Sequence, residues 1–168
     1  MKTKNSFSSI FACLNLILAL MLPSCSGESI TYTGKQQDGV SYSFDNDKSE
    51  ATATGYYVQD GKILTDIVLP EYIEAGNEQF KVISIADRAF VGGPFVSVTV
   101  GGNVRTIGNE AFADCDDIKT VNLEGKKLPL LPENAFDKTV YDNARLIIGT
   151  GIDVKGTGWE KFANVSDK

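Results

Sequence analysis

The sequence contains no histidine and only three cysteines among its 168 residues. Without histidine, the chain cannot build His-based acid and base catalysis, a Ser-His or Cys-His nucleophile system, or a His-type metal site. Basic residues are also scarce, since 16 Lys and Arg stand against 22 Asp and Glu, for a net charge of −6. Nucleic acid is not an expected partner, because its phosphates bind to clustered positive charge and no basic stripe is present. The length is typical of one globular domain.

The chain begins with a segment typical of export. Lys2 and Lys4 precede an apolar run from Ile10 to Leu22. This run of roughly 13 residues is shorter than the ~20 that a membrane-spanning helix needs, which favours a signal peptide over an anchor. One interpretation is a signal peptide that ends at a modified cysteine. A plain signal peptide with an incidental cysteine after it, or an uncleaved hydrophobic tail, is the alternative.

The end of this segment, LPSC, resembles the lipobox of bacterial lipoproteins. Leu22 stands three residues before Cys25, and the small Ser24 directly precedes the cysteine. The resemblance implies that residues 1–24 are a lipoprotein signal peptide and that Cys25 is acylated and becomes the first mature residue. Several acyl chains make a stable membrane anchor. Residues 25–38 are polar and contain glycine, so we expect a flexible tether.

Cysteine use fits this interpretation. Cys13 lies in the removed segment and Cys25 would carry lipid, so Cys115 is the one free thiol of the mature chain. A lone cysteine in an exported protein is a candidate nucleophile or an intermolecular bridge. The alternative, which the repeat pattern favours, is a small buried hydrophobic residue.

The chain repeats one phrase. IADRAF, IGNEAF and LPENAF end at Phe90, Phe112 and Phe136, which are 22 and 24 residues apart. A strand-like piece follows each phrase, at 95–100, 118–123 and 144–149. A step in the low twenties with one short strand is the length of a leucine-rich repeat coil. One coil cannot bury its apolar side alone, so we expect stacked coils with a parallel sheet and with the phenylalanines on the opposite wall.

Alternation within each strand predicts its two faces. Val121 and Leu123 point into the core, whereas Thr120 and Asn122 point outward, because side chains of a strand alternate. Gly108 and Asn109 predict a turn, followed by a short helical turn at 110–113.

The central repeat resembles the BspA-like leucine-rich repeat of bacterial surface proteins. The residues that carry the resemblance are Val104, Ile107, Gly108, Ala111, Phe112, Cys115, Ile118, Val121 and Leu123. Cys115 falls on the core cysteine of that repeat. Upstream, 39–55 and 67–90 are similar to the opening hairpin and first coil of such proteins. Downstream, 158–168 looks like their C-terminal cap, in which Trp159, Phe162 and Val165 would cover the last coil.

The resemblance implies a β-rich α/β solenoid, a right-handed stack of leucine-rich repeat coils with a parallel sheet and a cap at each end. Residues 39–66 would form an antiparallel N-terminal hairpin cap with its turn at Asp45 to Lys48, 67–148 the coils, and 149–168 the C-terminal cap. The first coil has glycine where the central one has cysteine, and the third carries DKTVYDN where a compact loop is expected, so we expect that coil to be distorted.

Three lookalike motifs are set aside. The glycine-rich segment 149–158 places Val154 where G-x-G-x-x-G needs glycine and Thr157 where a P-loop needs lysine. The acidic segments 45–50 and 114–117 lack the spacing of an EF-hand loop and are read as solvated turns. Nothing marks two carboxylates as a facing glycosidase pair. We expect no cofactor, no metal and no enzyme.

The outward strand residues are the candidate binding face, with ordinary solvent exposure as the alternative. They form two rows: Ser97, Thr120 and Arg145; Thr99, Asn122 and Ile147. The two resemblances together imply a lipid-anchored module on the cell surface, held in the outer membrane, that acts in adhesion or in binding an extracellular protein or glycan. An accessory lipoprotein subunit of an envelope complex is the alternative. The signal and the repeat type together suggest a bacterium of the Bacteroides kind.

Replacing Cys25 by Ala tests the anchor. Without the thiol no acyl chain is attached, so we expect the chain to leave the membrane fraction and appear in soluble fractions. Fractionation followed by immunoblotting measures this, and a variant that stays in the membrane fraction would contradict the lipobox interpretation.

Overall fold

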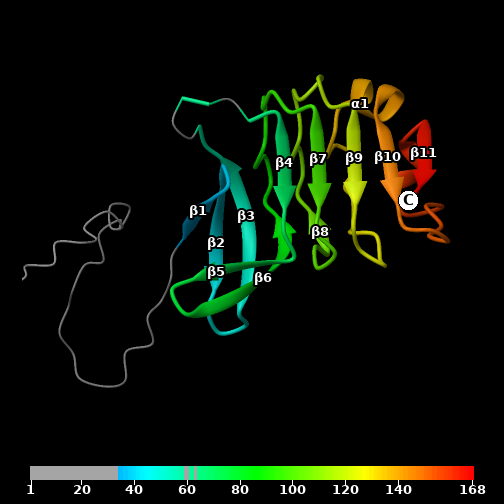
Figure 1. Ribbon diagram of the computed structural model, residues 1–168. Coiled ribbons are helices and arrows are strands. Elements are labelled where there is room, and N and C mark those ends of the chain that lie inside the picture. Colours follow the sequence, from blue (N-terminus) through cyan, green and yellow to red (C-terminus); the bar gives the residue numbers. More distant parts are fainter. Residues whose placement is uncertain (1–33, 59–60, 63) are drawn as a thin grey trace, which may run out of the picture. The chain divides into compact units, whose positions relative to one another are not determined.

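Five parallel strands form the sheet that runs through the repeats (Figure 1). In spatial order they are β4 (Asp66–Leu69), β7 (Ser97–Val100), β9 (Thr120–Leu123), β10 (Arg145–Ile148) and β11 (Asn164–Asp167). In the first four, every second side chain is buried in the core, as the alternating sequence predicts. The sequence predicts the three central strands, and the structure adds one on each side.

The computed structural model describes residues 34–58, 61–62 and 64–168. The signal segment 1–24, the acylation site Cys25 and the tether as far as residue 33 lie outside the described residues, so these stay predictions. In the part of the chain that the structure describes, neither helical segment has the length and apolar character that a membrane crossing requires.

A second, mixed sheet precedes the repeats. Its strands lie in the order β1 (Lys35–Gln37), β2 (Val40–Asp45), β3 (Glu50–Tyr56), β6 (Glu78–Ile85) and β5 (Tyr72–Ala75). The short strand β8 (Thr106–Ile107) also pairs with β6. The Lys35 ammonium on β1 donates a hydrogen bond to the Glu74 carbonyl on β5, so the two ends of this strand order lie close together.

The predicted hairpin is present in this sheet as β2 and β3, paired antiparallel. Lys48 closes its turn by donating from its backbone N–H to Asp45 Oδ1, at 3.2 Å. Residues Lys35–Gln37, which the sequence places in the tether, form β1 and pair with β2. The ordered part of the described chain therefore begins before Gly39.

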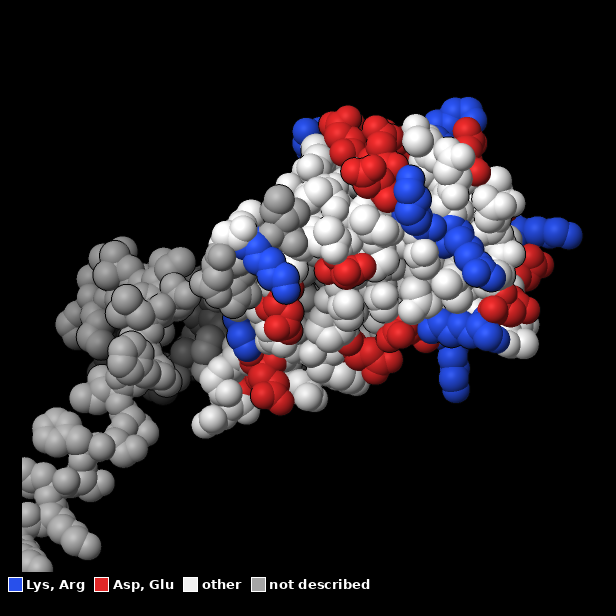
Figure 2. All heavy atoms as spheres, turned by 45° about the horizontal axis from the view of Figure 1, so that its top comes forward, with Lys and Arg blue, Asp and Glu red and all other residues white. Residues whose placement is uncertain are grey.

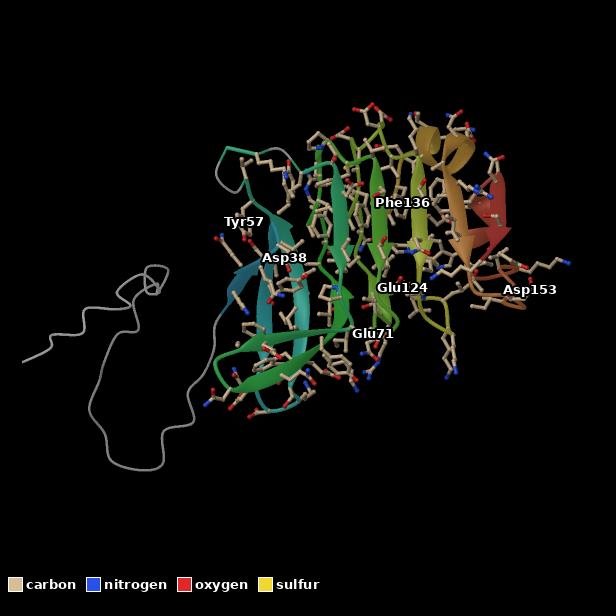
Figure 3. All side chains as sticks on the ribbon, viewed as in Figure 1. Asp38, Tyr57, Glu71, Glu124, Phe136 and Asp153 are labelled. Carbon is tan, nitrogen blue, oxygen red and sulfur yellow. The ribbon has the colours of Figure 1, made fainter. Side chains whose placement is uncertain are left out.

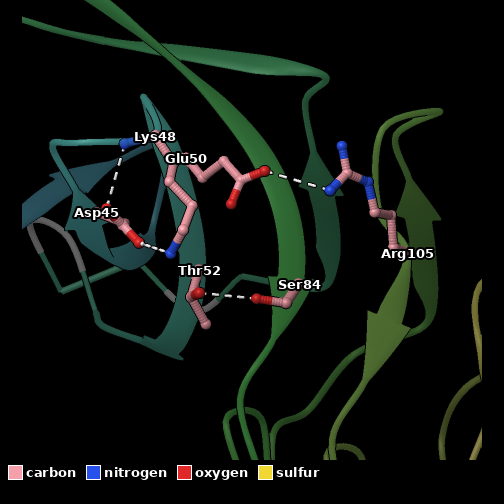
Figure 4. A network of polar contacts seen from close by, with 6 residues as sticks. All are labelled: Asp45, Lys48, Glu50, Thr52, Ser84 and Arg105. Carbon is pink, nitrogen blue, oxygen red and sulfur yellow. Dashed lines mark hydrogen bonds and ion pairs between the residues drawn. The ribbon is translucent and has the colours of Figure 1, made fainter.

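Polar contacts join the hairpin to the first repeat (Figure 4). Thr52 on β3 and Ser84 on β6 share a hydrogen bond between their hydroxyls at 2.7 Å. The Arg105 guanidinium, just before β8, lies 3.2 Å from the Glu50 carboxylate at the start of β3. These contacts cross between segments far apart in sequence, so the hairpin and the coils pack as one unit.

A column of phenylalanine rings lines the wall opposite the parallel sheet. The Phe90 and Phe112 ring centroids are 5.1 Å apart, and those of Phe112 and Phe136 are 4.8 Å apart, with the rings nearly parallel in both pairs. The backbone follows the same stacking, because Phe90 N–H donates to the Ala111 carbonyl and Phe112 N–H donates to the Ala135 carbonyl, both at 2.8 Å. The predicted alignment of the three phenylalanines is confirmed.

Aromatic rings close the column at both ends. The Phe95 ring meets Phe90 edge to face at 5.9 Å. At the other end, the rings of Trp159 and Phe162 meet the Phe136 ring edge to face, and both residues are buried. The expectation that Val165 joins them is wrong, since 41% of its surface is exposed. Val165 pairs in register with the buried Leu146, but no further coil among the described residues packs over it.

Cys115 is a core residue, as the repeat pattern predicts. It is 1% exposed, and its thiol donates to the Phe90 carbonyl oxygen at 3.0 Å. Burial raises the pKa of this thiol from an ordinary value of 9.0 to about 11. In the first coil, the equivalent Gly93 makes room for the Phe95 ring, because a Cβ at that glycine would lie 1.9 Å from a ring carbon.

One loop differs from the expectation, and a second, in the coil expected to be distorted, contains a helix. No helical turn forms at 110–113, where Glu110 instead has a φ of 53° in a tight turn. A positive φ is incompatible with a right-handed helix. The DKTVYDN segment of the third coil contains the short helix α1 (Lys138–Asn143), which buries Val140 and Tyr141 against the core. The extra residues of this coil therefore form a helical turn that packs against the core of the stack.

Phe112 has a stacked ring on both sides, so its truncation should destabilise the fold strongly. We expect Phe112→Ala to lower the free energy of unfolding by about 3–5 kcal/mol, since a core ring is replaced by a cavity. Urea denaturation followed by circular dichroism measures the change. Val165→Ala is the control, with an expected loss below about 0.5 kcal/mol at its exposed position. Equal losses in the two variants would contradict the role of the column.

The raised pKa of Cys115 predicts a loss of stability at alkaline pH. The folded state keeps the thiol protonated up to about pH 11, whereas the unfolded chain ionises near pH 9, so stability falls as the pH rises between these values. At pH 10 the loss from this group is on the order of 1 kcal/mol. Urea unfolding at pH 8 and pH 10 measures it. Cys115→Ala serves as reference, and parallel pH curves for the two proteins would contradict the prediction.

Candidate functional site on the outer face of the parallel sheet

The parallel register places the candidate residues in the two predicted rows. Ser97, Thr120 and Arg145 are direct neighbours on β7, β9 and β10, and so are Thr99, Asn122 and Ile147. Each of them alternates with a buried core residue along its strand. We call this surface the outer face. Arg145 is exposed and the other five side chains are half-buried.

The structure extends each row by one strand at both ends, which the sequence reasoning missed. Asp66 and Asn164 complete the first row, and Val68 and Ser166 complete the second. The alternating DIVL of β4, which matches the SVTV of β7, is the signal that could have located the first of these strands. At ~4.8 Å between strands, five strands give a face about 19 Å wide.

The side chains near the rims of the outer face are held by hydrogen bonds. Ser97 donates its hydroxyl proton to Asp66, and Arg145 Nε donates to Ser166 Oγ at 3.0 Å. The Ser166 hydroxyl in turn donates to the Leu146 carbonyl at 3.4 Å. These bonds fix the orientation of the two charged members of the rows, Asp66 and Arg145.

The centre of the outer face has hydrogen-bonding capacity that the protein does not use. Within the described residues, the side chains of Thr99, Thr120 and Asn122 make no hydrogen bond to the rest of the chain. The Asn122 Oδ1 is buried and has no partner. An unpaired buried acceptor costs about 1–3 kcal/mol, which a donor from a bound molecule would recover when the amide turns outward and exposes the oxygen.

Acidic residues lie together at the rim of the sheet where its strands begin. Acidic side chains gather toward the top of Figure 2, and the loop leading into β9 contributes the exposed Asp114, Asp116 and Asp117. The backbone N–H of Asp114 donates to Asp137 of the next coil at 2.5 Å, so part of this acidity stabilises the stacking of coils. In the described ranges, no three Asp, Glu, Cys or His side chains come together as metal ligands would.

Comparison with known proteins identifies the repeat. Residues 64–147 match the model of the BspA type leucine rich repeat region, which is built from six copies. A leucine-rich repeat protein from Bacteroides capillosus ATCC 29799 is similar in structure, with 20% identity, a TM-score of 0.56, and coverage of 82% of this chain and 99% of that one. A leucine rich cell surface protein from Faecalibacterium prausnitzii A2-165 has 16% identity, a TM-score of 0.48, and coverage of 80% of this chain and 42% of that one. A search of curated proteins finds no match.

The family match covers half of the chain and includes the strands β4, β7 and β9 and all three phenylalanines of the column. The fold of the Bacteroides protein agrees with it. The chain belongs to the BspA-type leucine-rich repeat family.

Proposed function

We propose that this chain is a lipid-anchored cell-surface protein that binds an extracellular protein or glycan through its outer face. Concave or flat faces of stacked repeats are common binding surfaces, because each coil adds one more row of outward side chains. The proposal includes no catalysis, since binding alone accounts for the residues of this face. It also includes a right-handed winding of the coils, with the β1–β3 segment and the residues around Trp159 as end caps.

This proposal rests on the unpaired polar side chains at the centre of the outer face. Thr99, Thr120 and Asn122 lie next to one another on β7 and β9 and combine free hydroxyls with a free amide. Such groups donate and accept hydrogen bonds without the desolvation cost of a charge. The charged Asp66 and Arg145 lie on either side, where they would orient a partner that carries complementary groups.

The location of the protein rests on the lipobox resemblance. An acylated Cys25 would hold the domain at a membrane, and the polar segment after it would leave the outer face open to large partners. The acidic balance of the chain disfavours adsorption of the domain onto anionic lipid, so contact with other molecules would be made by specific surfaces.

A double substitution in the centre of the outer face tests the proposal. We expect Thr99→Arg with Asn122→Arg to lower binding by at least tenfold, because two long cations would cover the free groups. The full chain, purified in detergent, is applied to immobilised host matrix proteins, glycans and envelope proteins, and the bound fraction is measured.

A matched control makes the same substitutions elsewhere. Thr139→Arg with Asn143→Arg changes the same residue types on the exposed side of α1 and should leave binding unchanged. Binding that survives the change on the outer face, or that both variants lose equally, would contradict the proposal. Binding to envelope proteins alone would favour the accessory subunit of an envelope complex.

A further inference from the structure

A groove lies at the carboxyl ends of β4, β7 and β9, apart from the two rows of the outer face. Its volume of about 560 Å³ is in the range of small-ligand sites. Three successive loops line it, with Glu71 after β4, Gly102 after β7, and the segment 124–128 after β9. Figure 3 shows Glu71 and Glu124 at this end of the sheet. Because the strands are parallel, stacking the coils brings these loops together.

Two glycines at equivalent places of neighbouring coils form the floor of the groove. Gly102 and Gly125 each lie two residues after a strand, and neither is among the described glycines with positive φ. Their identity is therefore not required by backbone conformation. A Cβ on Gly102 would lie 2.7 Å from the Glu71 carboxylate and 3.3 Å from the Gly125 Cα. Glycine at both positions therefore lets the two loops and the Glu71 side chain pack this closely.

The peptide groups of this floor are available to a ligand. The backbone N–H and C=O of Gly102 and Gly125 make no hydrogen bond to any other residue of the described chain. The loop around them is nevertheless fixed, because Val104 N–H donates to the Gly101 carbonyl at 3.1 Å and Asn103 Nδ2 donates to the Glu71 carbonyl at 3.1 Å. A rigid loop with free main-chain groups is suited to hydrogen bonding with another main chain.

Both signs of charge line the groove, and within the described residues three of its charged groups are unpaired, whereas Arg105 pairs with Glu50. Glu71 is exposed at the β4 side, and Lys126 and Lys127 are exposed on the loop after β9. Among the described residues none of these three forms an ion pair, whereas Glu124 lies 3.8 Å from the Lys168 ammonium. Glu71 and the two lysines belong to different coils, and the Glu71 carboxylate lies over Gly102 of the coil between them.

We propose that this groove binds an extended peptide segment that carries both a basic and an acidic side chain. The basic side chain would pair with Glu71, the acidic one with Lys126 or Lys127, and the peptide backbone would bond to the glycine floor. A sugar ring or base is disfavoured, because the lining residues include no aromatic ring on which it could stack.

Fluorescence anisotropy with the full chain in detergent tests this inference. The probes are labelled eight-residue Gly/Ser peptides that carry Lys and Asp three residues apart, and their Gln and Asn counterparts. We expect the charged peptide to bind at least tenfold more tightly than the uncharged one. Its binding should weaken at 0.5 M salt, because exposed charges are screened.

Matched glycine variants test the floor of the groove. Gly102→Ala should reduce binding at least tenfold, by displacing Glu71 and crowding Gly125. Gly55→Ala should leave it unchanged, since the added Cβ would lie at an ordinary 3.5 Å from the Ala89 carbonyl. Retained binding by a folded Gly102→Ala variant would overturn the proposal.

A thermodynamic cycle keeps the proposal testable even if Gly102→Ala fails to fold. Glu71→Gln and the Lys→Gln change in the peptide should each weaken binding several-fold, and the combination should be no weaker than either alone. Additive losses would overturn the assignment of Glu71, and displacement of the peptide by neutral sugars would overturn the ligand class. The Thr99→Arg, Asn122→Arg variant should keep full peptide binding, which separates this groove from the outer face.

Discussion

No coil of this protein can bury its apolar side without a neighbour, and the aromatic column is where that dependence is strongest. Each of Phe90, Phe112 and Phe136 covers the next ring, and the backbone at the same place bonds to the following coil. A ring without its neighbour would expose a large apolar surface to water, which is the main free-energy cost that stacking removes. Different rings therefore close the two ends, Phe95 at one and Trp159 with Phe162 at the other.

Stacking also produces the surfaces that would recognise other molecules. Since the coils are in parallel register, equivalent positions line up across strands, so a change of one residue type in one coil alters one place in a row. Threonine and asparagine at the central positions give the outer face its unpaired polar groups. Glycine at the second position after two strands lets the loops that line the groove pack closely. Both surfaces depend on the same repeat, and they differ in charge and in shape.

Much of this architecture could be predicted because the repeat signal combines a fixed step with strand alternation. The three central strands, the ring column, the buried Cys115 and the two outward rows all follow from it. β1 and β4 were harder to recognise, because neither is preceded by the repeated phrase and their pairing depends on partners distant in sequence. The sequence around Glu110 predicts a helical turn because such a short segment is compatible with either a helical turn or a tight turn. The positive φ of Glu110, which distinguishes the two, cannot be read from the sequence. Val165 fits the buried pattern by alternation, but burial also requires a covering neighbour.

The pairing of the parallel sheet has a consequence for how the chain folds. Paired residues in this sheet are 19 to 31 positions apart along the sequence, so no strand contact is local. Closing such loops costs entropy before any contact compensates for it, which makes the assembly of this sheet slow compared with helical domains of similar length. During that interval the strand edges stay unpaired, and crowded chains would compete for them. Nascent copies of the chain therefore have to be kept apart until the coils have closed.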